Sequence, residues 1–558
     1  MASSPVPKDI SQEDTKCPCS SSLPLSSSAS LPSSSPPHIQ PIPLFKVYMS
    51  PDAKDEVGKV LDSGYITQGP KVDQFESEMK AKIFQNYPYL LSLHSGTDAL
   101  SLAVRLLDLS FSDEIISPAL TCTATNWAIL ENRVRIKWAD VDPETCNINL
   151  DDVEKKLTEN TKAIMVVHWG GYPVDLDRLR QIQLKYESTY QHPLYIIEDC
   201  AHALGATYNG KPIGTHGNIC CFSLQAIKHL TCGDGGLILL PDEKMYQRAK
   251  RLRWFGIDRD QRSKGDFRLE ADIPEWGYKY HMNDINATIG LCNLPHFPSI
   301  LKAHQDNADY YDRELINIPG IQLLSRHSNR KGSMWIYSLR VTDKPGFIEF
   351  MTSKKIMVSQ VHNRNDHHSC VKEFQCLLPL LDQLEKELIA IPNGWWITPA
   401  QREYIVQCIK EWSDTFSLRL LSASDYHKGF LSLLSQLTQY PYALSESEFQ
   451  SRLNTISHSS ACIDVLERQS RIIASMKLVL VPTFSDSYVH VEEIVVDSAL
   501  RNRGIGKWMV SHIPHLLSSR NIHAYKLVLE CKPSLVLFYR SCGYIEEGTE
   551  MVYRLPSV

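Results

Sequence analysis

The sequence predicts an α/β protein built around a mostly parallel sheet with helices on both faces. Short apolar runs alternate with longer amphipathic segments from about residue 89 to residue 240. Glycine-rich turns such as Gly233–Gly236 separate some of these segments. This alternation is typical of strand–helix–strand units with parallel strands. A strand followed by a glycine turn near residue 504 predicts a second α/β module in the C-terminal part.

The length and composition predict a soluble protein of several domains. The chain has 558 residues, which is more than one domain usually contains, and 43% of them are hydrophobic and 22% charged. A net charge of -6 gives no reason to expect nucleic-acid binding. No apolar run approaches the ~20 residues that a membrane span needs. The 15 scattered cysteines suit reduced thiols. We therefore expect a cytoplasmic protein that binds neither nucleic acid nor membrane.

Residues 1–42 form a tail that is rich in serine and proline. This composition cannot bury a core, so the tail is predicted to be disordered. It lacks the apolar segment of a secretory signal and is poor in arginine, unlike a transit peptide. The folded part is expected to begin at residue 43.

The stretch from Ile197 to Gly236 carries most of the predicted chemistry. An apolar strand ends in Glu198-Asp199, which places the Asp199 carboxylate at the edge where open α/β sheets bind ligands. Lys228 follows in a loop. This spacing suits pyridoxal 5′-phosphate (PLP), with Asp199 on the ring nitrogen and Lys228 holding the aldehyde as a Schiff base. A strand-end carboxylate and a surface lysine without function would give the same pattern.

Three motifs in this stretch resemble the DegT/DnrJ/EryC1/StrS family of PLP-dependent sugar aminotransferases, which have fold type I. The motifs are Glu198-Asp-Cys-Ala-His202, Phe222-Ser-Leu-Gln-Ala-Ile-Lys228 and Thr231-Cys-Gly-Asp-Gly-Gly236. The resemblance covers residues 43–412, including a small C-terminal subdomain, and implies that His202 contacts the cofactor. Some members are dehydratases with histidine in place of the lysine. Since Lys228 is present, the resemblance implies transamination.

Ser95-Gly96-Thr97 follows another apolar strand and begins a helix. Free backbone N–H groups at a helix N-terminus bind phosphate. We therefore predict that Gly96 and Thr97 form one wall of the PLP phosphate site and that Ser223 forms another. A plain helix cap by Ser95 or Thr97 is the alternative. The neighbouring PLP motifs favour phosphate binding.

Two further segments resemble the family. Residues 118–126 match a segment whose aromatic side chain usually stacks on the cofactor ring, but Cys122 stands at that position and Trp127 is a substitute candidate. Gly277-Tyr-Lys279-Tyr resembles a motif that reaches the partner's cofactor phosphate across a dimer interface. The resemblance implies a homodimer and assigns that contact to Lys279. An exposed segment leading into a helix is the alternative.

The segment from His362 to His368 is dense in polar side chains. Three histidines and one aspartate suggest a metal site, but they lack the helical spacing of paired ligands. We expect no metal here. Arginine and histidine donors suit the phosphates and hydroxyls of a nucleotide sugar, so His362 and Arg364 are predicted to contact the substrate.

A second module, residues 413–558, contains an apolar strand at 490–496 followed by a glycine turn and a helix. Backbone N–H groups in such a turn form a pyrophosphate cradle. This order of strand, glycine turn and helix resembles that of GNAT acetyltransferases, which bind acetyl-CoA at the turn. The module resembles glucosamine-6-phosphate N-acetyltransferase more closely. The predicted CoA contacts are Ile494, Val496, Arg501, Arg503, Gly504, Gly506 and Lys507.

The same resemblance assigns the chemistry of acetyl transfer. Tyr539 would protonate the leaving CoA thiolate, and Glu493 would face the amine-bearing sugar. Backbone groups from Ile494 to Val496 would polarise the thioester carbonyl. Leu535 stands where the family usually has asparagine, which departs from the pattern for substrate orientation. A core aromatic without catalytic function is the alternative for Tyr539.

Together the two modules predict a bifunctional enzyme of amino-sugar biosynthesis. The first would transfer an amine, with glutamate as donor, to a nucleotide-linked keto-sugar, and Lys228 would move the proton. The second would acetylate an amino sugar with acetyl-CoA, for which a sugar phosphate is an alternative substrate. Other possibilities are that one module is inactive or that the chain is a non-catalytic scaffold.

Overall fold

The computed structural model describes residues 40–259, 272–437, 444–468, 470–484, 486–501, 504–540 and 542–546. Residues 1–39 of the predicted tail lie outside the described residues. Ile42, at the end of that predicted tail, belongs to the fold, because it is only 1% exposed and forms a parallel bridge with Ile356. The described residues from Pro41 onward form one unit.

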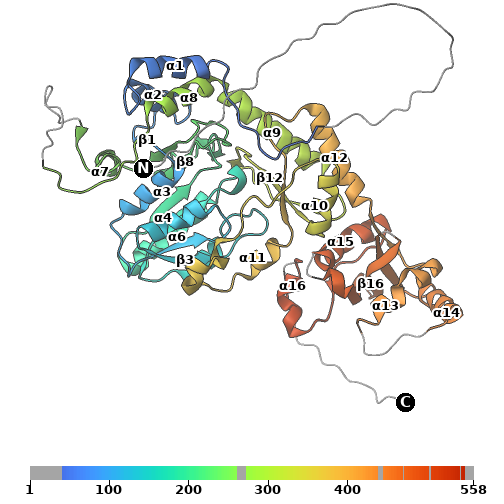
Figure 1. Cartoon of the computed structure of the whole chain (residues 1–558). Helices are drawn as coiled ribbons and strands as arrows, with labels where there is room; N and C mark the ends of the chain where they lie inside the picture. Colours follow the sequence, from blue (N-terminus) through green and yellow to red (C-terminus); the bar gives the residue numbers. More distant parts are fainter. Residues whose placement is uncertain are drawn as a thin grey trace, which may run out of the picture. The chain divides into compact units, whose positions relative to one another are not determined.

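A seven-stranded sheet is the centre of the first domain (Figure 1). Its order is β1 (Leu90–Leu93), β9 (Gly236–Leu239), β8 (Ile219–Ser223), β5 (Tyr195–Asp199), β4 (Thr161–Val167), β2 (Glu114–Pro118) and β3 (Arg135–Ala139). The strands from β8 to β3 pair in parallel, and β9 runs antiparallel to both neighbours. This confirms the predicted mostly parallel sheet.

Both faces of this sheet are buried. Adjacent strand residues belong to opposite hydrophobic clusters, as Ile196 and Cys220 do on one side and Ile197 and Cys221 on the other. Side chains alternate between the faces of a strand, so two separate clusters require cover on both sides. The covering and flanking helices are α1 (Ala53–Ser63), α2 (Pro70–Lys82), α3 (Gly96–Arg105), α4 (Thr123–Glu131), α5 (Leu150–Lys156), α6 (Leu176–Tyr190), α7 (Glu243–Leu252) and α8 (Asp284–Asn293).

A smaller subdomain follows, with a three-stranded antiparallel sheet in the order β10-β12-β13. Its strands are β10 (Ile321–Leu323), β12 (Tyr337–Val341) and β13 (Leu388–Ile391), and its helices are α9 (Phe297–Glu314), α10 (Lys344–Ser353), α11 (Pro379–Leu384) and α12 (Pro399–Ser413). A second small sheet joins β6 (Thr207–Tyr208), β7 (Lys211–Pro212) and β11 (Arg330–Lys331).

The C-terminal domain has its own five-stranded sheet, β14 to β18 in sequence order. The strands are β14 (Phe416–Leu420), β15 (Ala461–Arg468), β16 (Arg471–Pro482), β17 (Ser487–Val496) and β18 (Leu527–Val528), and the helices are α13 (Phe430–Leu434), α14 (Glu446–Ser457), α15 (Ile505–Ser519) and α16 (Val536–Arg540). The strands pair antiparallel except β17 and β18, whose short parallel pairing ends at His490 and Val528.

The connection between the domains is short. Helix α12 ends at Ser413, where the second module was predicted to begin, and β14 starts at Phe416. The rings of Trp412 and Phe416 lie 5.1 Å apart, so the connecting residues are folded over an aromatic contact.

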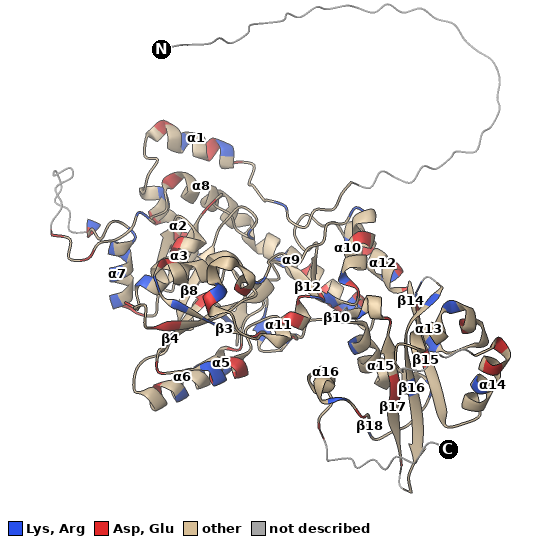
Figure 2. Ribbon diagram, turned by 60° about the horizontal axis from the view of Figure 1, so that its bottom comes forward, with Lys and Arg blue, Asp and Glu red and all other residues tan. Residues whose placement is uncertain are grey.

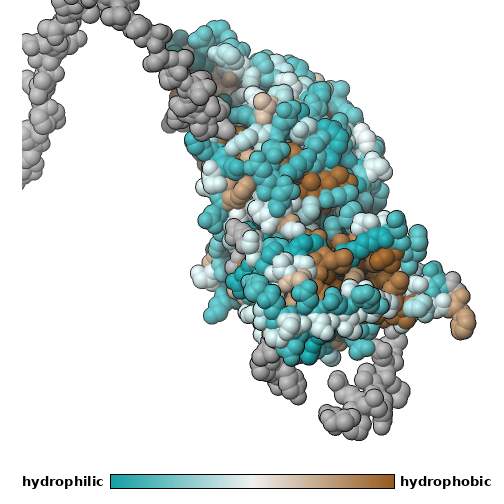
Figure 3. All heavy atoms as spheres, turned by 90° about the vertical axis from the view of Figure 1, so that its right-hand side faces the viewer, coloured by the Kyte–Doolittle hydropathy of each residue, from teal (hydrophilic) through white to brown (hydrophobic). Residues whose placement is uncertain are grey.

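The surface is of mixed character. Lysine and arginine are interspersed with aspartate and glutamate on helices such as α1 and α14 (Figure 2). The face drawn in Figure 3 is hydrophilic over most of its area, with hydrophobic residues gathered in its lower half. Within the described ranges, no helix has both the length and the apolar character needed to cross a membrane.

Candidate active sites

Lys228 lies in the loop after β8, where its Nζ is 3.7 Å from the ring centroid of Trp335. Burial lowers the pKa of its amine to about 8, and the Asp199 carboxylate opposes this shift. An amine with a pKa this close to neutrality can both accept and release a proton at physiological pH.

Asp199 is the last residue of β5, in the middle of the sheet, and is 4% exposed. Its Oδ2 accepts a hydrogen bond from the Thr125 hydroxyl (2.6 Å), and its Oδ1 accepts one from the Ala201 N–H (3.0 Å). Burial raises the pKa of the carboxyl, whereas these donors and the Lys228 ammonium lower it. The structure therefore brings Asp199 and Lys228 together, as the sequence predicts.

Two histidine rings lie beside this pair. His202 stacks on Trp335 with centroids 4.0 Å apart, and His362 lies parallel to His202 at 5.7 Å. Burial and the nearby Lys228 amine lower the pKa of both histidines, that of His362 to about 4, so both rings are neutral at pH 7. His202 Nδ1 and His362 Nε2 are buried without a hydrogen-bond partner among the described residues. Such nitrogens can bind a polar ligand group.

The residues predicted to form the phosphate wall lie where α3 begins. A Cβ atom added to Gly96 would lie 2.8 Å from the Ser223 Cβ, so only glycine allows the helix to start this close to the end of β8. The Ser95 hydroxyl accepts the Asp98 N–H (3.0 Å) and caps the helix. The cap is compatible with a phosphate site. The N–H groups of Gly96 and Thr97 lie in the first turn, where they have no acceptor within the helix and can bind an anion.

Two predicted contacts lie outside this cluster. Lys279 is exposed on an extended segment that bridges Trp254, so its role in a partner's site stays a prediction. Trp127 packs edge-on against His368 at 5.7 Å, while Cys122 precedes α4 as its N-cap residue. The aromatic side chain beside Lys228 is instead Trp335, which the sequence analysis missed because no motif surrounds it.

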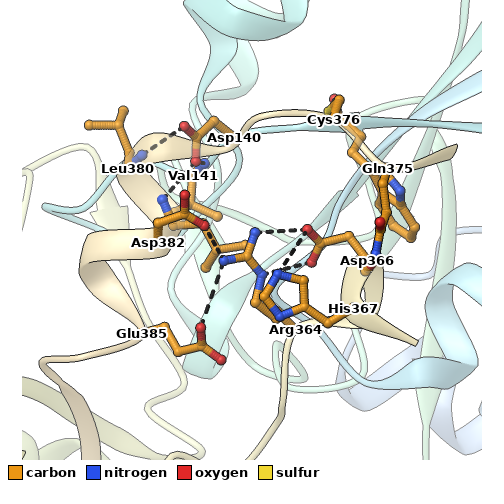
Figure 4. A network of polar contacts seen from close by, with 12 residues as sticks. Asp140, Val141, Arg364, Asp366, His367, Gln375, Cys376, Leu380, Asp382 and Glu385 are labelled. Carbon is orange, nitrogen blue, oxygen red and sulfur yellow. Dashed lines mark hydrogen bonds and ion pairs between the residues drawn. The ribbon is translucent and has the colours of Figure 1, made fainter. Parts of the chain in front are cut away.

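Arg364 has a different environment from the one predicted. It is 3% exposed, and its guanidinium binds both oxygens of Asp366 as well as Asp382 and Glu385 (Figure 4). Its donors are therefore committed to carboxylates of its own chain. Arg364 holds this loop together, and the expected direct contact with a substrate would require it to leave these partners.

His168, Glu198 and Cys200 are close enough for their ligand atoms to share a metal ion. The His168 Nε2 lies 2.7 Å from Glu198, and its Nδ1 accepts the Val174 N–H at 3.0 Å. Because Nδ1 is an acceptor, Nε2 carries the proton and donates it to Glu198. Hydrogen bonding accounts for both ring nitrogens, so this group fixes the end of β5.

Most of the acetyl-CoA residues predicted in the second domain line one cavity of about 350 Å³, together with Gln383, Lys386 and Glu387 of the first domain. The predicted residues that line it are Ile494, Val496, Arg501, Gly504, Gly506, Lys507 and Tyr539. Gly504 precedes α15 with a φ of 81°, a backbone conformation that glycine adopts without steric cost. The Arg501 Nε donates to the Val496 carbonyl (2.9 Å), which ties the turn to β17. Arg503 lies outside the described residues.

The strand beside this cavity contains a bulge. Ser475 pairs with Val495 but Lys477 with Glu492, so β17 has one extra residue, and Glu493 takes a φ of 52°. A bulge leaves backbone groups without a ladder partner and redirects side chains. Glu493 is exposed there, and Leu535 lines the cavity. Burial raises the pKa of Tyr539 on α16, so its hydroxyl keeps the proton that a general acid needs.

Comparison with known proteins decides the family. Residues 48–410 match the DegT/DnrJ/EryC1/StrS aminotransferase family, and residues 459–546 match the acetyltransferase (GNAT) domain. The chain belongs to the DegT/DnrJ/EryC1/StrS aminotransferase family. The expected fold classes and both transferase assignments are thereby confirmed.

Solved structures agree with this family assignment. AtS13 from Actinomadura melliaura is 48% identical (TM-score 0.65), with 67% of this chain and 99% of that chain covered. The sugar aminotransferase CalS13 from Micromonospora echinospora is 42% identical (TM-score 0.64; 66% and 99% covered). The PLP form of the putative sugar aminotransferase Spr1654 from Streptococcus pneumoniae is 26% identical (TM-score 0.61; 67% and 99% covered). The first domain of this family member is thus a PLP-dependent sugar aminotransferase, and the GNAT domain uses acetyl-CoA.

The residues of the aminotransferase site fit PLP. The buried Asp199 carboxylate suits the ring nitrogen of PLP, and the buried Lys228 amine of lowered pKa suits its aldehyde. The unpartnered nitrogens of His202 and His362 can bind polar groups such as its hydroxyl. The start of α3, where only glycine fits, suits its phosphate.

Proposed function

We propose that the chain is a bifunctional enzyme that aminates a nucleotide-linked keto-sugar and acetylates an amino sugar. Glutamate is the proposed amine donor. The observation that carries the first activity is the grouping of Lys228, Asp199, His202 and His362 at the end of the central sheet. The cavity that gathers the predicted CoA contacts carries the second.

In the aminotransferase site each residue has one proposed task. Asp199 faces the ring nitrogen, His202 faces the ring hydroxyl, and the α3 N-terminus with Ser223 binds the phosphate. When bound, PLP supplies the electron sink of the reaction. Lys228 moves the proton, which its pKa of about 8 allows in both directions.

His362 is the proposed substrate contact. Its neutral ring presents a buried, unpartnered Nε2 beside the Lys228 amine. A neutral imidazole can exchange hydrogen bonds with a sugar hydroxyl, whereas a charged ring would repel the ammonium. Arg364 contributes indirectly by holding the loop that carries His362.

The proposed location is the cytoplasm. The cysteines of the described ranges are free thiols, including Cys370 and Cys376 at the surface. Exposed thiols persist in a reducing compartment, where nucleotide sugars and acetyl-CoA would also be at hand.

We expect the first domain to act as a homodimer whose sites each use Lys279 of the other protomer. Lys279 is exposed, and nearby Trp276 and Phe255 are also exposed, at 65% and 42%. Mixing protomers with Lys228→Ala and protomers with Lys279→Ala should restore activity, because one composite site in a mixed dimer is intact. Light scattering measures the oligomeric state, and glutamate turnover measures the restored activity. A fully active monomer would contradict it.

Tyr539→Phe should lower kcat for acetyl transfer about 100-fold or more, since it removes the proton donor for the thiolate. The affinity for acetyl-CoA should change little. Because burial raises the pKa of Tyr539, the wild-type rate should be flat through neutral pH and fall only at alkaline pH, as the hydroxyl deprotonates. Tyr544→Phe is the matched control, since its ring centroid lies 6.0 Å from that of Tyr539. Equal losses in both variants would show a packing role only.

Mass spectrometry tests the proposed function directly. The full chain would be incubated with a panel of nucleotide keto-sugars, glutamate and PLP, with and without acetyl-CoA. We expect a gain of one amine on one sugar and a further acetyl group when acetyl-CoA is added. Acetylation of a sugar phosphate but not of the aminated product would show that the two domains act on different substrates.

A further inference from the structure

The hydroxyl of Thr125 lies directly against the Asp199 carboxylate. The Oγ1–Oδ2 distance is 2.6 Å, and Thr125 and Asp199 are 0% and 4% exposed. Thr125 comes from the first turn of α4 and Asp199 from the end of β5, so the fold and not the local sequence makes this contact.

The direction of this hydrogen bond follows from the chemistry of the groups. An ionised carboxylate can only accept, so Thr125 donates its one hydroxyl proton to Asp199. The Thr121 Oγ1 lies 2.8 Å from the Thr125 Oγ1, and Thr121 is 2% exposed. With its own proton committed, Thr125 accepts from Thr121. The chain of donors therefore runs from Thr121 through Thr125 to Asp199.

Thr125 is held in this position by the residue that follows it. The Asn126 Nδ2 donates to the Pro118 carbonyl (3.1 Å), and its Oδ1 accepts the Ser117 hydroxyl (2.6 Å). These bonds fix the first turn of α4 to the end of β2. A β-branched side chain on a fixed helical turn has few rotamers, so the Thr125 hydroxyl is preorganised.

Asp199 keeps room for a ligand. Each of its oxygens has one donor, Thr125 on Oδ2 and Ala201 on Oδ1, and a carboxylate has about four acceptor sites. The charged or titratable groups that interact with Asp199 include Lys228 and His168, and the buried thiols of Cys200 and Cys221. Burial favours the neutral acid, and the hydroxyl of Thr125 is the donor that most opposes it.

We propose that Thr125 is a positioning residue of the amino-transfer reaction, which keeps Asp199 ionised and aimed at the ring nitrogen of PLP. Thr121 fixes the direction of the Thr125 hydroxyl. The proposal rests on the proposed function, in which Asp199 is the partner of that nitrogen.

The hydrogen bond from Thr125 affects the reaction through the proton that Asp199 and the PLP ring nitrogen share. The ring nitrogen must hold its proton for the ring to act as an electron sink. Without Thr125, the Asp199 carboxylate is more basic and takes a larger share of that proton. With PLP bound, a more basic Asp199 would leave the ring less positive, and the Lys228 nitrogen that would hold its aldehyde would be more basic as well.

Thr125→Val tests the proposal in the PLP-loaded full chain, since valine keeps the shape and removes the donor. The visible absorbance of the lysine-bound cofactor should change at a higher pH than in the wild type. The rate of the half-reaction with glutamate should fall by roughly 10- to 100-fold, the value of a hydrogen bond to a charged group. Thr125→Ser keeps the donor and should restore most of both properties.

Two controls separate positioning from general damage. Thr288→Val removes another buried hydroxyl, which donates to the Asp284 carbonyl, and should leave the absorbance titration unchanged. Thr121→Val leaves Thr125 in place and should shift the titration in the same direction by less. Thermal melting of the apoprotein shows that each variant is folded. No shift with Thr121→Val would overturn the role given to Thr121.

Asp199→Asn distinguishes failure of this proposal from failure of the proposed function. We expect it to lose more activity than Thr125→Val, and the double variant to match Asp199→Asn alone, because Thr125 acts through Asp199. If Thr125→Val keeps the wild-type titration and half-reaction rate while Asp199→Asn loses both, the positioning role is wrong and the function stands. If Asp199→Asn also keeps both, Asp199 is not the ring partner.

Discussion

Lys228→Ala should reduce amino transfer to the background rate while acetyl transfer continues. Lys228 provides the amine that lies beside Asp199, with a pKa lowered to about 8 by burial. Alanine can neither bind the aldehyde of the cofactor nor move the proton, so both halves of the reaction lose their reactive group. Glutamate turnover and acetyl-CoA consumption in the same preparation measure the two activities.

Lys228→Arg is the matched control for this experiment. Arginine keeps a positive charge near Asp199 and Trp335 but does not release its proton in proteins. It should be as inactive as alanine in amino transfer, while its cofactor affinity should stay nearer to that of the wild type. More than a tenth of wild-type turnover in either variant would mean that another amine performs the reaction.

Gly504→Asp should abolish binding of acetyl-CoA and leave the colour of the PLP site unchanged. Gly504 stands where α15 begins, with a φ of 81°, and lines the cavity of the predicted CoA contacts, which Glu387 of the first domain also lines. A Cβ added to Gly504 would lie 3.4 Å from the Glu387 side chain, so an aspartate there would add a second negative charge to the cavity in which the pyrophosphate is expected to bind. Two unit charges at about 4 Å near a protein surface repel by about 4 kcal/mol, which predicts a Kd raised by about 1000-fold. Isothermal titration with acetyl-CoA measures this.

Gly504→Ala separates charge from backbone strain. Alanine at this positive φ costs about 1 kcal/mol, so it should weaken binding by less than tenfold. In the full chain supplied with a keto-sugar, Gly504→Asp should let the unacetylated amino sugar accumulate. If the wild type with ample acetyl-CoA accumulates the same amine, the two domains do not act in sequence.

The parts of the fold that local pattern controls could be predicted from the sequence. The alternation of strands and helices predicted the parallel sheet. The carboxylate after an apolar strand predicted Asp199 at the carboxyl ends of the strands. The start of α3 was weighed both as a plain cap by Ser95 or Thr97 and as a phosphate site at Gly96 and Thr97; the structure shows the Ser95 cap, and the phosphate site stays a prediction. Site residues that belong to one motif on a single strand or turn could thus be predicted from the sequence.

Contacts between segments that are distant in the sequence could not be predicted from it. Trp335 reaches Lys228 from the subdomain after β11, and Thr125 reaches Asp199 from another helix, with no motif at either position. Arg364 was expected to bind substrate because its charge is visible in the sequence. Asp366 lies two residues further along the same loop, but the contacts with Asp382 and Glu385 depend on how α11 packs beside that loop. The bulge at Glu493 depends on the register of β16 against β17, which no single strand specifies.

The folded connection between α12 and β14 determines how the chain should respond to proteases. The Asp414 N–H donates to the Lys410 carbonyl (2.8 Å) and the Thr415 N–H to the Trp412 carbonyl (3.2 Å), while Trp412 is 1% exposed. A protease must draw several residues into an extended form, which these bonds and the packed indole resist. Limited digestion should therefore spare this junction, and a fragment that begins at residue 413 would lose the ring against which Phe416 packs.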